Sequence, residues 1–263
     1  MTLPDHISQG RGDTAVFLLH GVGGAKEAWL VTMAALADVG MRAVAWDMPG
    51  YGTSATLSPY TLHGLALALE SLIDHVGARR NVLLGHSMGG MVAQEAVALY
   101  PAKVHGLLLC ATSPAFGRAD GDWQRKFLQA RFAPLDAGLG MAGLAAQLVP
   151  AMVGPDASAA TVEAARSMMA GVPEASYRAA LAAIAGFDRL AQLPHIAVPT
   201  LCVAGEHDRN AAPAVVHQMA QRIPDAGYLC LPGAGHLVNL ERPREFNAAA
   251  LSFVQHHFPT REP

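Results

Sequence analysis

Charged residues are scarce in this sequence, and neither sign dominates. Its 263 residues include 18 lysines and arginines against 21 aspartates and glutamates, so the formal net charge is only −3. A nucleic-acid-binding surface needs a concentration of basic residues, and we therefore expect no nucleic-acid partner. Hydrophobic residues make up 52% of the chain, which is enough to build a large core and argues against disorder.

Long hydrophobic runs are also missing. The longest, such as Gly106–Ala111 and Met141–Ala146, fall far short of the roughly 18 apolar residues that a membrane-spanning helix needs. The first residues, MTLPDHISQGRGD, contain no basic region followed by an apolar stretch, which a secretory signal would have. We therefore expect a cytoplasmic protein without membrane contact.

Cysteine is rare. Cys110, Cys202 and Cys230 are an odd number and lie in apolar, strand-like stretches, which predicts buried free thiols in a reducing compartment. No pair of histidines or cysteines has the spacing of a metal site. The sequence predicts neither a metal nor an organic cofactor.

Short apolar runs alternate with segments of helical spacing over much of the chain. This alternation predicts an α/β fold, with a mostly parallel sheet covered by helices on both faces. The predicted strands are Ala15–Leu19, Arg42–Asp47, Asn81–Leu84, Val104–Cys110, Thr200–Ala204 and Tyr228–Leu231. The predicted helices lie near Lys26–Val39, Thr61–Val76, Met88–Tyr100, Pro213–Ile223 and Pro243–His256.

Residues 114–194 interrupt this alternation. They contain helical patches rich in alanine, leucine and methionine, broken by prolines, and no convincing strand. The stretch is far longer than an ordinary crossover connection. It predicts a helical cap, residues 114–194, inserted into a core made of residues 1–113 and 195–263.

The strongest local signal for chemistry is Gly85-His86-Ser87-Met88-Gly89, which follows the strand Asn81–Leu84 and precedes a predicted helix. In a G-x-S-x-G turn the glycines allow strand and helix to approach closely while the serine is held in a strained conformation. The context predicts an exposed Ser87 hydroxyl at the end of the sheet. Ser87 is the candidate nucleophile.

A serine hydroxyl needs a base that is itself oriented by an acid. Asp208 and His236 each follow a predicted strand, so both should lie at the same sheet edge as Ser87. They are the candidate acid and base. Asp208 as a helix cap, and Glu206 as the acid, remain alternatives.

Acyl transfer also needs hydrogen-bond donors for the developing oxyanion. The first strand leads into His20-Gly21-Val22-Gly23-Gly24. We expect the backbone N–H groups of Val22 and Met88 to form the oxyanion hole, and His20 to brace the loop. A plain strand-to-helix turn is the alternative for this loop.

Candidates to line an apolar pocket between core and cap are distributed over the chain, although each is also compatible with ordinary packing. They are Trp29, Phe116, Trp123, Met152 and Leu237. For an acidic substrate, Arg118, Arg125 or Arg131 in the cap is a candidate partner of its carboxylate.

Together these motifs resemble the α/β-hydrolase superfamily. The resemblance rests on the segments 20–24 and 85–90, on Asp47-Met-Pro-Gly-Tyr-Gly-Thr-Ser54, and on Asp208 and Gly235-His236, in that family's order. It implies an α/β-hydrolase fold with a cap inserted before the strand that bears the acid, and a structural role for the loop Asp47–Ser54. Because only 14 residues precede Ala15, we expect at most one short strand there. The exposed sheet edge would then suit a homodimer contact.

Within the superfamily the chain is most similar to 3-oxoadipate enol-lactonases. The similar segments include Gly89-Gly-Met-Val-Ala-Gln94, Pro173-Glu-Ala-Ser-Tyr177 and the stretch 235–243. The cap departs from that subfamily at Gln147–Met152, where a tryptophan-containing stretch is expected, and at 116–139. The resemblance implies a serine hydrolase that cleaves an ester or lactone of a small molecule.

Three other functions remain open. Carbon–carbon bond hydrolases of ring-cleavage products share the serine triad but often carry other residues at the positions of His86 and Leu237. Cofactor-free haloperoxidases or perhydrolases resemble esterases closely. A non-catalytic small-molecule-binding module would keep the fold without turnover.

Overall fold

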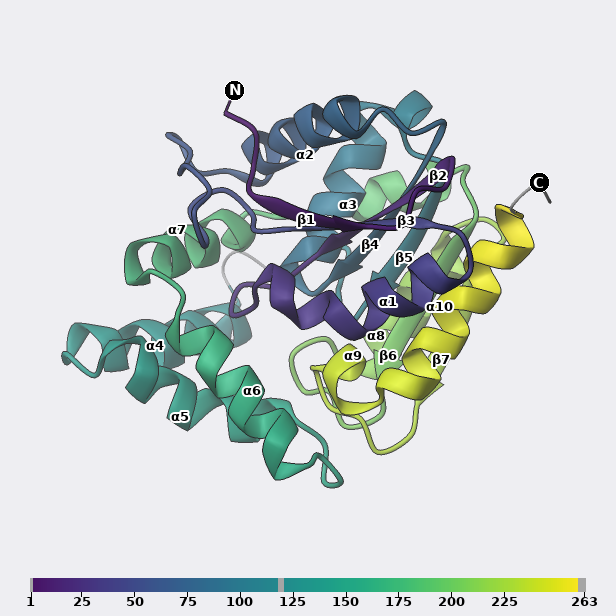
Figure 1. The fold of residues 1–263 in the computed structure, drawn as a ribbon. Helices are drawn as coiled ribbons and strands as arrows, with labels where there is room; N and C mark the ends of the chain where they lie inside the picture. The colour runs from purple at the N-terminus through teal and green to yellow at the C-terminus, as the bar shows by residue number, and fades with distance from the viewer. Residues whose placement is uncertain (1, 118–120, 260–263) are drawn as a thin grey trace.

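The computed structural model describes residues 2–117 and 121–259 and contains a seven-stranded sheet (Figure 1). The strand order is β1-β3-β2-β4-β5-β6-β7, in which β1 is antiparallel to β3 and the remaining pairs are parallel. The six predicted strands are all present, with ends shifted by no more than two residues. The strands are β1 (His6–Gln9), β2 (Thr14–Leu19), β3 (Arg42–Trp46), β4 (Arg80–His86), β5 (Gly106–Cys110), β6 (Thr200–Gly205) and β7 (Gly227–Leu231).

Helices cover both faces of the sheet because its central strands are apolar on both sides. All six residues of β2 are buried, and successive residues point to opposite faces. Phe17 packs into a cluster with α2, α3 and α8, whereas Leu18 packs into a second cluster with α1 and α10. These helices are α1 (Leu30–Asp38), α2 (Leu62–Val76), α3 (Met88–Leu99), α8 (Pro213–Arg222) and α10 (Pro243–His257); a 3₁₀ turn, Lys26–Trp29, precedes α1.

The amino-terminal part of the sheet is short. A single four-residue strand, β1, precedes β2 and pairs with β3 in the register His6 to Trp46. This confirms the expectation of at most one short strand before Ala15. A homodimer contact along this edge stays a prediction.

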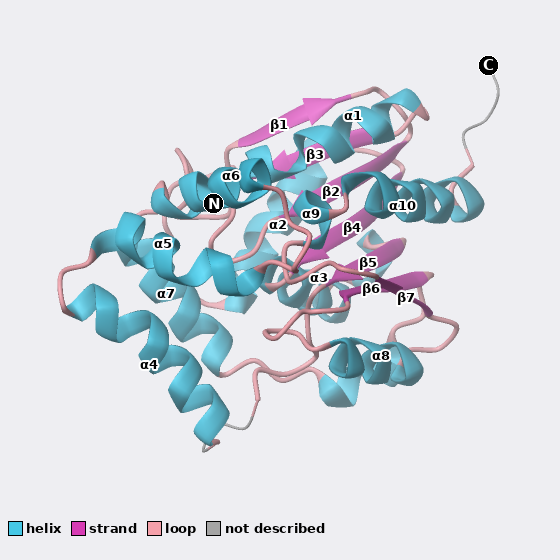
Figure 2. Ribbon diagram, turned by 90° about the horizontal axis from the view of Figure 1, so that it is seen from below, coloured by secondary structure: helices cyan, strands magenta, loops and turns pink. Residues whose placement is uncertain are grey.

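In the described part of the chain between β5 and β6, where the sequence predicts an insertion, there are four α-helices. Figures 1 and 2 show them gathered beside the sheet instead of on its two faces. Pro134 and Pro150 each lie in the last turn of a helix, which ends two residues later. No helix in the described ranges is both long and apolar enough to cross a bilayer. The four are α4 (Asp122–Asp136), α5 (Gly140–Met152), α6 (Ala159–Ala170) and α7 (Glu174–Ala185).

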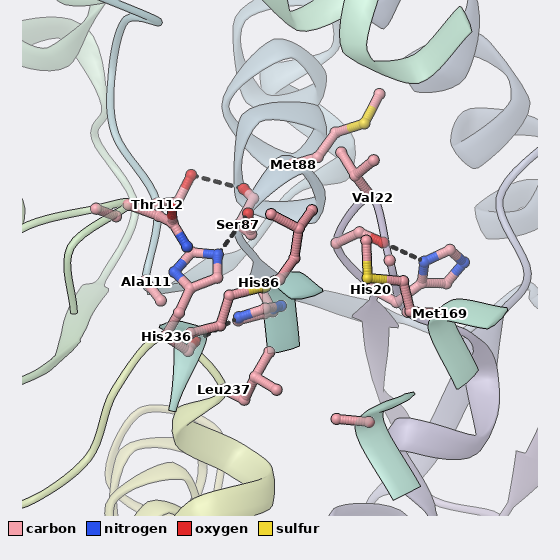
Figure 3. A pocket seen from close by; sticks show the side chains of 18 of the residues that line it. His20, Val22, His86, Ser87, Met88, Ala111, Thr112, Met169, His236 and Leu237 are labelled. Atoms are coloured by element: carbon pink, nitrogen blue, oxygen red, sulfur yellow. Dashed lines mark hydrogen bonds between the residues drawn. The ribbon is translucent and has the colours of Figure 1, made fainter. Parts of the chain in front are cut away.

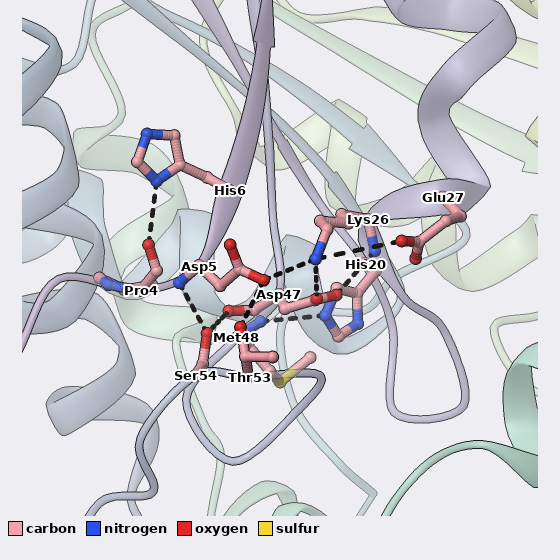
Figure 4. A network of polar contacts seen from close by, with 10 residues as sticks. All are labelled: Pro4, Asp5, His6, His20, Lys26, Glu27, Asp47, Met48, Thr53 and Ser54. Carbon is pink, nitrogen blue, oxygen red and sulfur yellow. Dashed lines mark hydrogen bonds and ion pairs between the residues drawn. The ribbon is translucent and has the colours of Figure 1, made fainter.

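A network of ion pairs joins three segments at one end of the sheet (Figure 4). Lys26 Nζ lies 2.7 Å from Asp5 Oδ2 and 2.6 Å from Asp47 Oδ2, and the Lys26 backbone N–H donates to Asp47 Oδ1. Ser54 Oγ donates to the Asp47 carbonyl and accepts from the Asp5 N–H. The loop Asp47–Ser54, which follows β3, is therefore tied to the segment before β1 and to Lys26 after β2, which is a structural role.

We expect Lys26→Met to destabilise the fold by roughly 3 kcal/mol, because it leaves the buried Asp47 carboxylate without its cation. Lys103→Met is the matched control: Lys103 pairs with the exposed Asp74, and its loss should leave the free energy of unfolding near the wild-type value, because exposed ion pairs contribute little. Urea unfolding at pH 7 measures both free energies. Equal values for the two variants would contradict the assigned role of Lys26.

The same network predicts a pH dependence of stability. The hydrogen bond from Lys26 lowers the folded-state pKa of Asp5 below its usual 3.8. The stabilisation by ionised Asp5 is therefore complete above about pH 4 and is lost as the pH falls through the lower folded pKa. Lys26→Met should weaken this acid dependence.

Candidate active site

Ser87 lies in a sharp turn between β4 and α3. Its backbone has φ 54° and ψ −118°, a strained conformation for a non-glycine residue, and α3 begins at the next residue. The glycines on both sides are needed for space. A Cβ at Gly89 would lie 2.1 Å from the Leu19 carbonyl oxygen, and one at Gly85 would lie 2.4 Å from that of Gly89. The predicted strand–turn–helix around Ser87 is confirmed.

Ser87, His236 and Asp208 form one hydrogen-bonded chain. His236 Nε2 lies 3.0 Å from Ser87 Oγ, and His236 Nδ1 lies 2.8 Å from Asp208 Oδ2 (Figure 3 shows the first contact). The three side chains come from the loops after β4, β7 and β6, whose carboxyl ends share one edge of the parallel sheet. The sequence-predicted trio is thus brought together.

Asp208 is oriented by its own loop. Its Oδ1 accepts the backbone N–H groups of Asn210 (2.7 Å) and Ala211 (3.0 Å), which leaves Oδ2 to His236. Although burial opposes ionisation, His236 and these N–H donors lower the pKa of Asp208 below its usual value. The competing Glu206 instead accepts the N–H of Gly233 and is exposed. An ionised Asp208 keeps a proton on Nδ1 of His236, so Nε2 is available to accept the Ser87 proton.

The backbone of His236 is held from two sides. Its N–H donates to the carbonyl of Met152, at the end of α5, over 2.6 Å, and its carbonyl accepts from His86 Nε2 at 2.8 Å. Burial lowers the pKa of His86 to about 3, so this side chain is neutral and Nε2 carries the donated proton. His86 therefore helps to position the backbone of His236.

Glu241 is a residue that the sequence reasoning missed. From the short helix α9 (Val238–Glu241), its carboxylate accepts three backbone N–H groups, those of Gly154, Gly235 and Leu237, at 2.6 to 3.0 Å. Two of these flank His236 and the third follows α5. Glu241 thus connects the loop of His236 to the helices inserted after β5. Its position four residues after Leu237 gave no signal of this contact.

We expect Glu241→Gln to lower kcat about 10- to 100-fold with a smaller change in KM. The amide replaces one accepting oxygen by a donor, so the His236 loop shifts, and small displacements of a reacting group are costly. Glu241 does not line the cavity beside Ser87. Glu245→Gln, an exposed change on α10, is the control in steady-state kinetics; identical kcat values for both variants would reject this role.

The loop after β2 runs directly against Ser87. A Cβ at Gly21 would lie 3.0 Å from that of Ser87. The Gly21 carbonyl accepts from His20 Nδ1 (2.8 Å) and from the Gly24 N–H (3.0 Å). His20 Nε2 in turn accepts from the Met48 N–H, and burial lowers the pKa of His20 to about 4, so the ring is neutral.

These contacts orient one of the two predicted oxyanion donors, and the start of α3 supplies the other. In a trans peptide the N–H points opposite to the C=O, so fixing the Gly21 carbonyl directs the Val22 N–H away from His20. The Met88 N–H is at the first residue of α3, where helix N–H groups have no intrahelical acceptor. Val22 and Met88 lie near Ser87 in Figure 3. His20 braces the loop, as expected from the sequence.

A cavity opens beside Ser87 between the sheet edge and the helices α4 to α7. All five predicted pocket residues line it: Trp29, Phe116, Trp123, Met152 and Leu237. They differ in solvent exposure: Trp29 is 1% exposed, whereas Trp123 is 46% exposed.

The three cap arginines named from the sequence have different positions. Arg131 lines the cavity, whereas Arg125 is exposed and pairs with Asp122. Arg118 lies outside the described residues. Across residues 2–117 and 121–259, no group of three or more His, Cys, Asp or Glu side chains is arranged to hold a metal ion.

The sheet order, the serine turn and the helical insertion define an α/β-hydrolase fold. Residues 16–249 match the alpha/beta hydrolase family, and the chain belongs to that family. The fold class and the superfamily resemblance expected from the sequence are therefore confirmed.

Two curated relatives align with almost the whole chain. A dihydrolipoyllysine-residue acetyltransferase component of the acetoin cleaving system of Pseudomonas putida is 32% identical over 94% of this chain, which spans 65% of that relative's length. A putative carbamate hydrolase of Variovorax paradoxus is 30% identical, covering 91% of each chain.

Two solved structures share the fold closely. A thermophilic esterase from Thermogutta terrifontis has a TM-score of 0.86 at 26% identity, over 96% of this chain and 93% of the esterase. The enol-lactonase of Burkholderia xenovorans LB400 has a TM-score of 0.83 at 26% identity, over 95% and 96% respectively. The lactonase-like similarity predicted from the sequence is thus confirmed.

Proposed function

We propose that the chain is a serine hydrolase that cleaves a carboxylic ester or lactone of a small molecule through an acyl-enzyme. The observation that carries this proposal is the continuous hydrogen-bonded chain from Ser87 Oγ through His236 to Asp208, at 3.0 and 2.8 Å. It lies beside a largely apolar cavity. The likeness to an esterase and an enol-lactonase supports the same reaction class.

The proposed reaction has two halves. Ser87 Oγ attacks the carbonyl carbon while His236 Nε2 takes its proton, and Asp208 stabilises the imidazolium that forms. The oxyanion is stabilised by the Val22 and Met88 N–H groups. His236 then gives the proton to the leaving oxygen, and the acyl group remains on Ser87. A water deprotonated by His236 attacks the ester and releases the acid, which restores the serine. In a lactone the leaving oxygen stays attached to the released acid.

We assign residues 114–194 the role of a cap over this site. The cavity takes part of its lining from α4 to α7, and Phe116, Trp123 and Met152 contribute apolar surface there. Such a lining suits a substrate with a hydrophobic body and excludes bulk water from the acyl-enzyme. The core then supplies the reacting groups and the cap supplies the selectivity.

A panel of substrates tests the proposal against its alternatives. The purified protein is assayed on short and medium p-nitrophenyl esters, an enol-lactone and a ring-cleavage dienone. Hydrolysis of an ester or the lactone supports the proposal, and the preferred substrate assigns the subclass. Turnover of the dienone alone would favour carbon–carbon bond hydrolysis. Binding without any turnover would favour a non-catalytic module.

A further inference from the structure

One charged side chain lines the cavity beside Ser87. Within the described part of the chain, Arg131 on α4 is the sole lysine, arginine, aspartate or glutamate in the lining. The three lining histidines include His20 and His86, which burial keeps neutral. A fixed positive charge in an apolar cavity is unfavourable unless an anion pairs with it.

The contacts of Arg131 are all with neutral groups. Its guanidinium carbon lies 3.3 Å from the centroid of the Phe127 ring, a cation–π contact. Nη1 donates to the Phe127 carbonyl at 3.1 Å, and Nη2 lies 3.4 Å from Asn210 Oδ1. Burial lowers the pKa of Arg131, which is the effect of withdrawing this cation from water without a compensating anion.

Other partly buried arginines of the chain do have carboxylate partners. Arg189 Nη2 lies 2.6 Å from Glu95, and Arg178 pairs with Asp136 and Glu174. Among the described residues, no carboxylate lies within 4.0 Å of Arg131. Arg131 therefore differs from Arg178 and Arg189 in having no carboxylate partner among the described residues.

A neutral donor lines the same cavity as this cation. Tyr177 on α7 lines the same cavity, is 2% exposed and has its pKa raised to about 12 by burial, so it keeps its proton. A guanidinium and a phenol hydroxyl that line one cavity can together donate to the two oxygens of a carboxylate.

We propose that the substrate carries a carboxylate in addition to its ester or lactone, and that Arg131 binds this group with Tyr177 while Ser87 attacks the carbonyl. The inference rests on the proposed function and narrows its substrate class. Because Asn210 connects Arg131 to the loop of Asp208, the carboxylate subsite and the reacting groups are held in one framework.

The test compares the mono-p-nitrophenyl esters of succinate, glutarate and adipate, which keep a free carboxylate, with the same compounds capped as methyl esters. We expect the wild type to prefer at least one half-ester. Arg131→Met should lower the half-ester to capped-ester ratio of kcat/KM about 10- to 100-fold, mainly through KM, because a charge-assisted hydrogen bond is lost. Arg131→Lys should retain part of the preference. Arg125→Met, on the exposed side of the same helix, should leave the ratio at the wild-type value.

Two outcomes would overturn this inference and still leave the proposed ester hydrolysis intact. One is equal kcat/KM for half-ester and capped ester at all three chain lengths, and the other is a ratio that Arg131→Met does not change. Calorimetry with monomethyl glutarate on the Ser87→Ala protein adds a readout without turnover. Binding weakened by Arg131→Met supports the subsite, even if the wild type hydrolyses nothing and the proposed function falls. Binding that is equally strong in both proteins rejects the subsite.

Discussion

Ser87→Ala is expected to lower kcat by about four to six orders of magnitude, because it removes the hydroxyl oxygen that we propose carries the acyl group. His236 would remain bonded to Asp208, and the cavity would keep its shape, so substrate binding should persist. Steady-state kinetics on the preferred ester measure the loss of kcat. Mass spectrometry of the purified variant confirms that it contains no wild-type protein. A residual rate above that of water is compatible with the account, since oxyanion donors and binding act without the nucleophile.

The matched control for this variant is Ser71→Ala, on α2, where the hydroxyl only donates to the Leu67 carbonyl. It should keep the wild-type rate. If Ser87→Ala and Ser71→Ala both hydrolyse the ester at wild-type rates, Ser87 is not the nucleophile and the proposed mechanism is wrong.

Asp208→Asn is expected to lower kcat by about four orders of magnitude while the protein stays folded. The reason is the tautomer of His236. The amide oxygen would take the place of Oδ1 and accept the N–H groups of Asn210 and Ala211, so the NH₂ group would face His236 Nδ1. Nδ1 would then have to accept a hydrogen bond, the ring proton would move to Nε2, and His236 could no longer deprotonate Ser87.

Glu206→Gln supplies the control, because it changes the other carboxylate of the same loop. Glu206 is exposed and accepts the N–H of Gly233, so its replacement should leave kcat near the wild-type value. Comparing kcat of the two variants by pre-steady-state and steady-state kinetics shows whether Asp208 or Glu206 is the acid. A large loss in Glu206→Gln with an active Asp208→Asn would reassign the acid.

Much of the site could be predicted because local sequence determines it. Gly85 and Gly89 are required because a Cβ at either position would lie less than 2.5 Å from a backbone carbonyl oxygen. Ser87, Asp208 and His236 each follow a strand, and parallel strands bring their carboxyl ends to one edge. The sequence therefore predicted their meeting without any knowledge of the distances.

Other features depend on contacts between distant segments and leave no local pattern. Glu241 bonds to Gly154, which is 87 residues away, and nothing in either segment signals the pairing. The absence of a described carboxylate near Arg131 depends on its neighbours from α7 and the Asp208 loop, which are distant in the sequence. Prolines were predicted to break the helical patches, and α4 and α5 each end two residues after a proline, Pro134 and Pro150, which has no N–H to donate.

The most direct test of the account is the mass of the acyl-enzyme. The protein is mixed with a slowly hydrolysed p-nitrophenyl ester, quenched in acid, and analysed by intact-protein and peptide mass spectrometry. One acyl group per chain is expected on the peptide that contains Ser87, and none in Ser87→Ala. Turnover of the ester with no adduct at Ser87 in the quenched wild type, or with the acyl group on another residue, would contradict it.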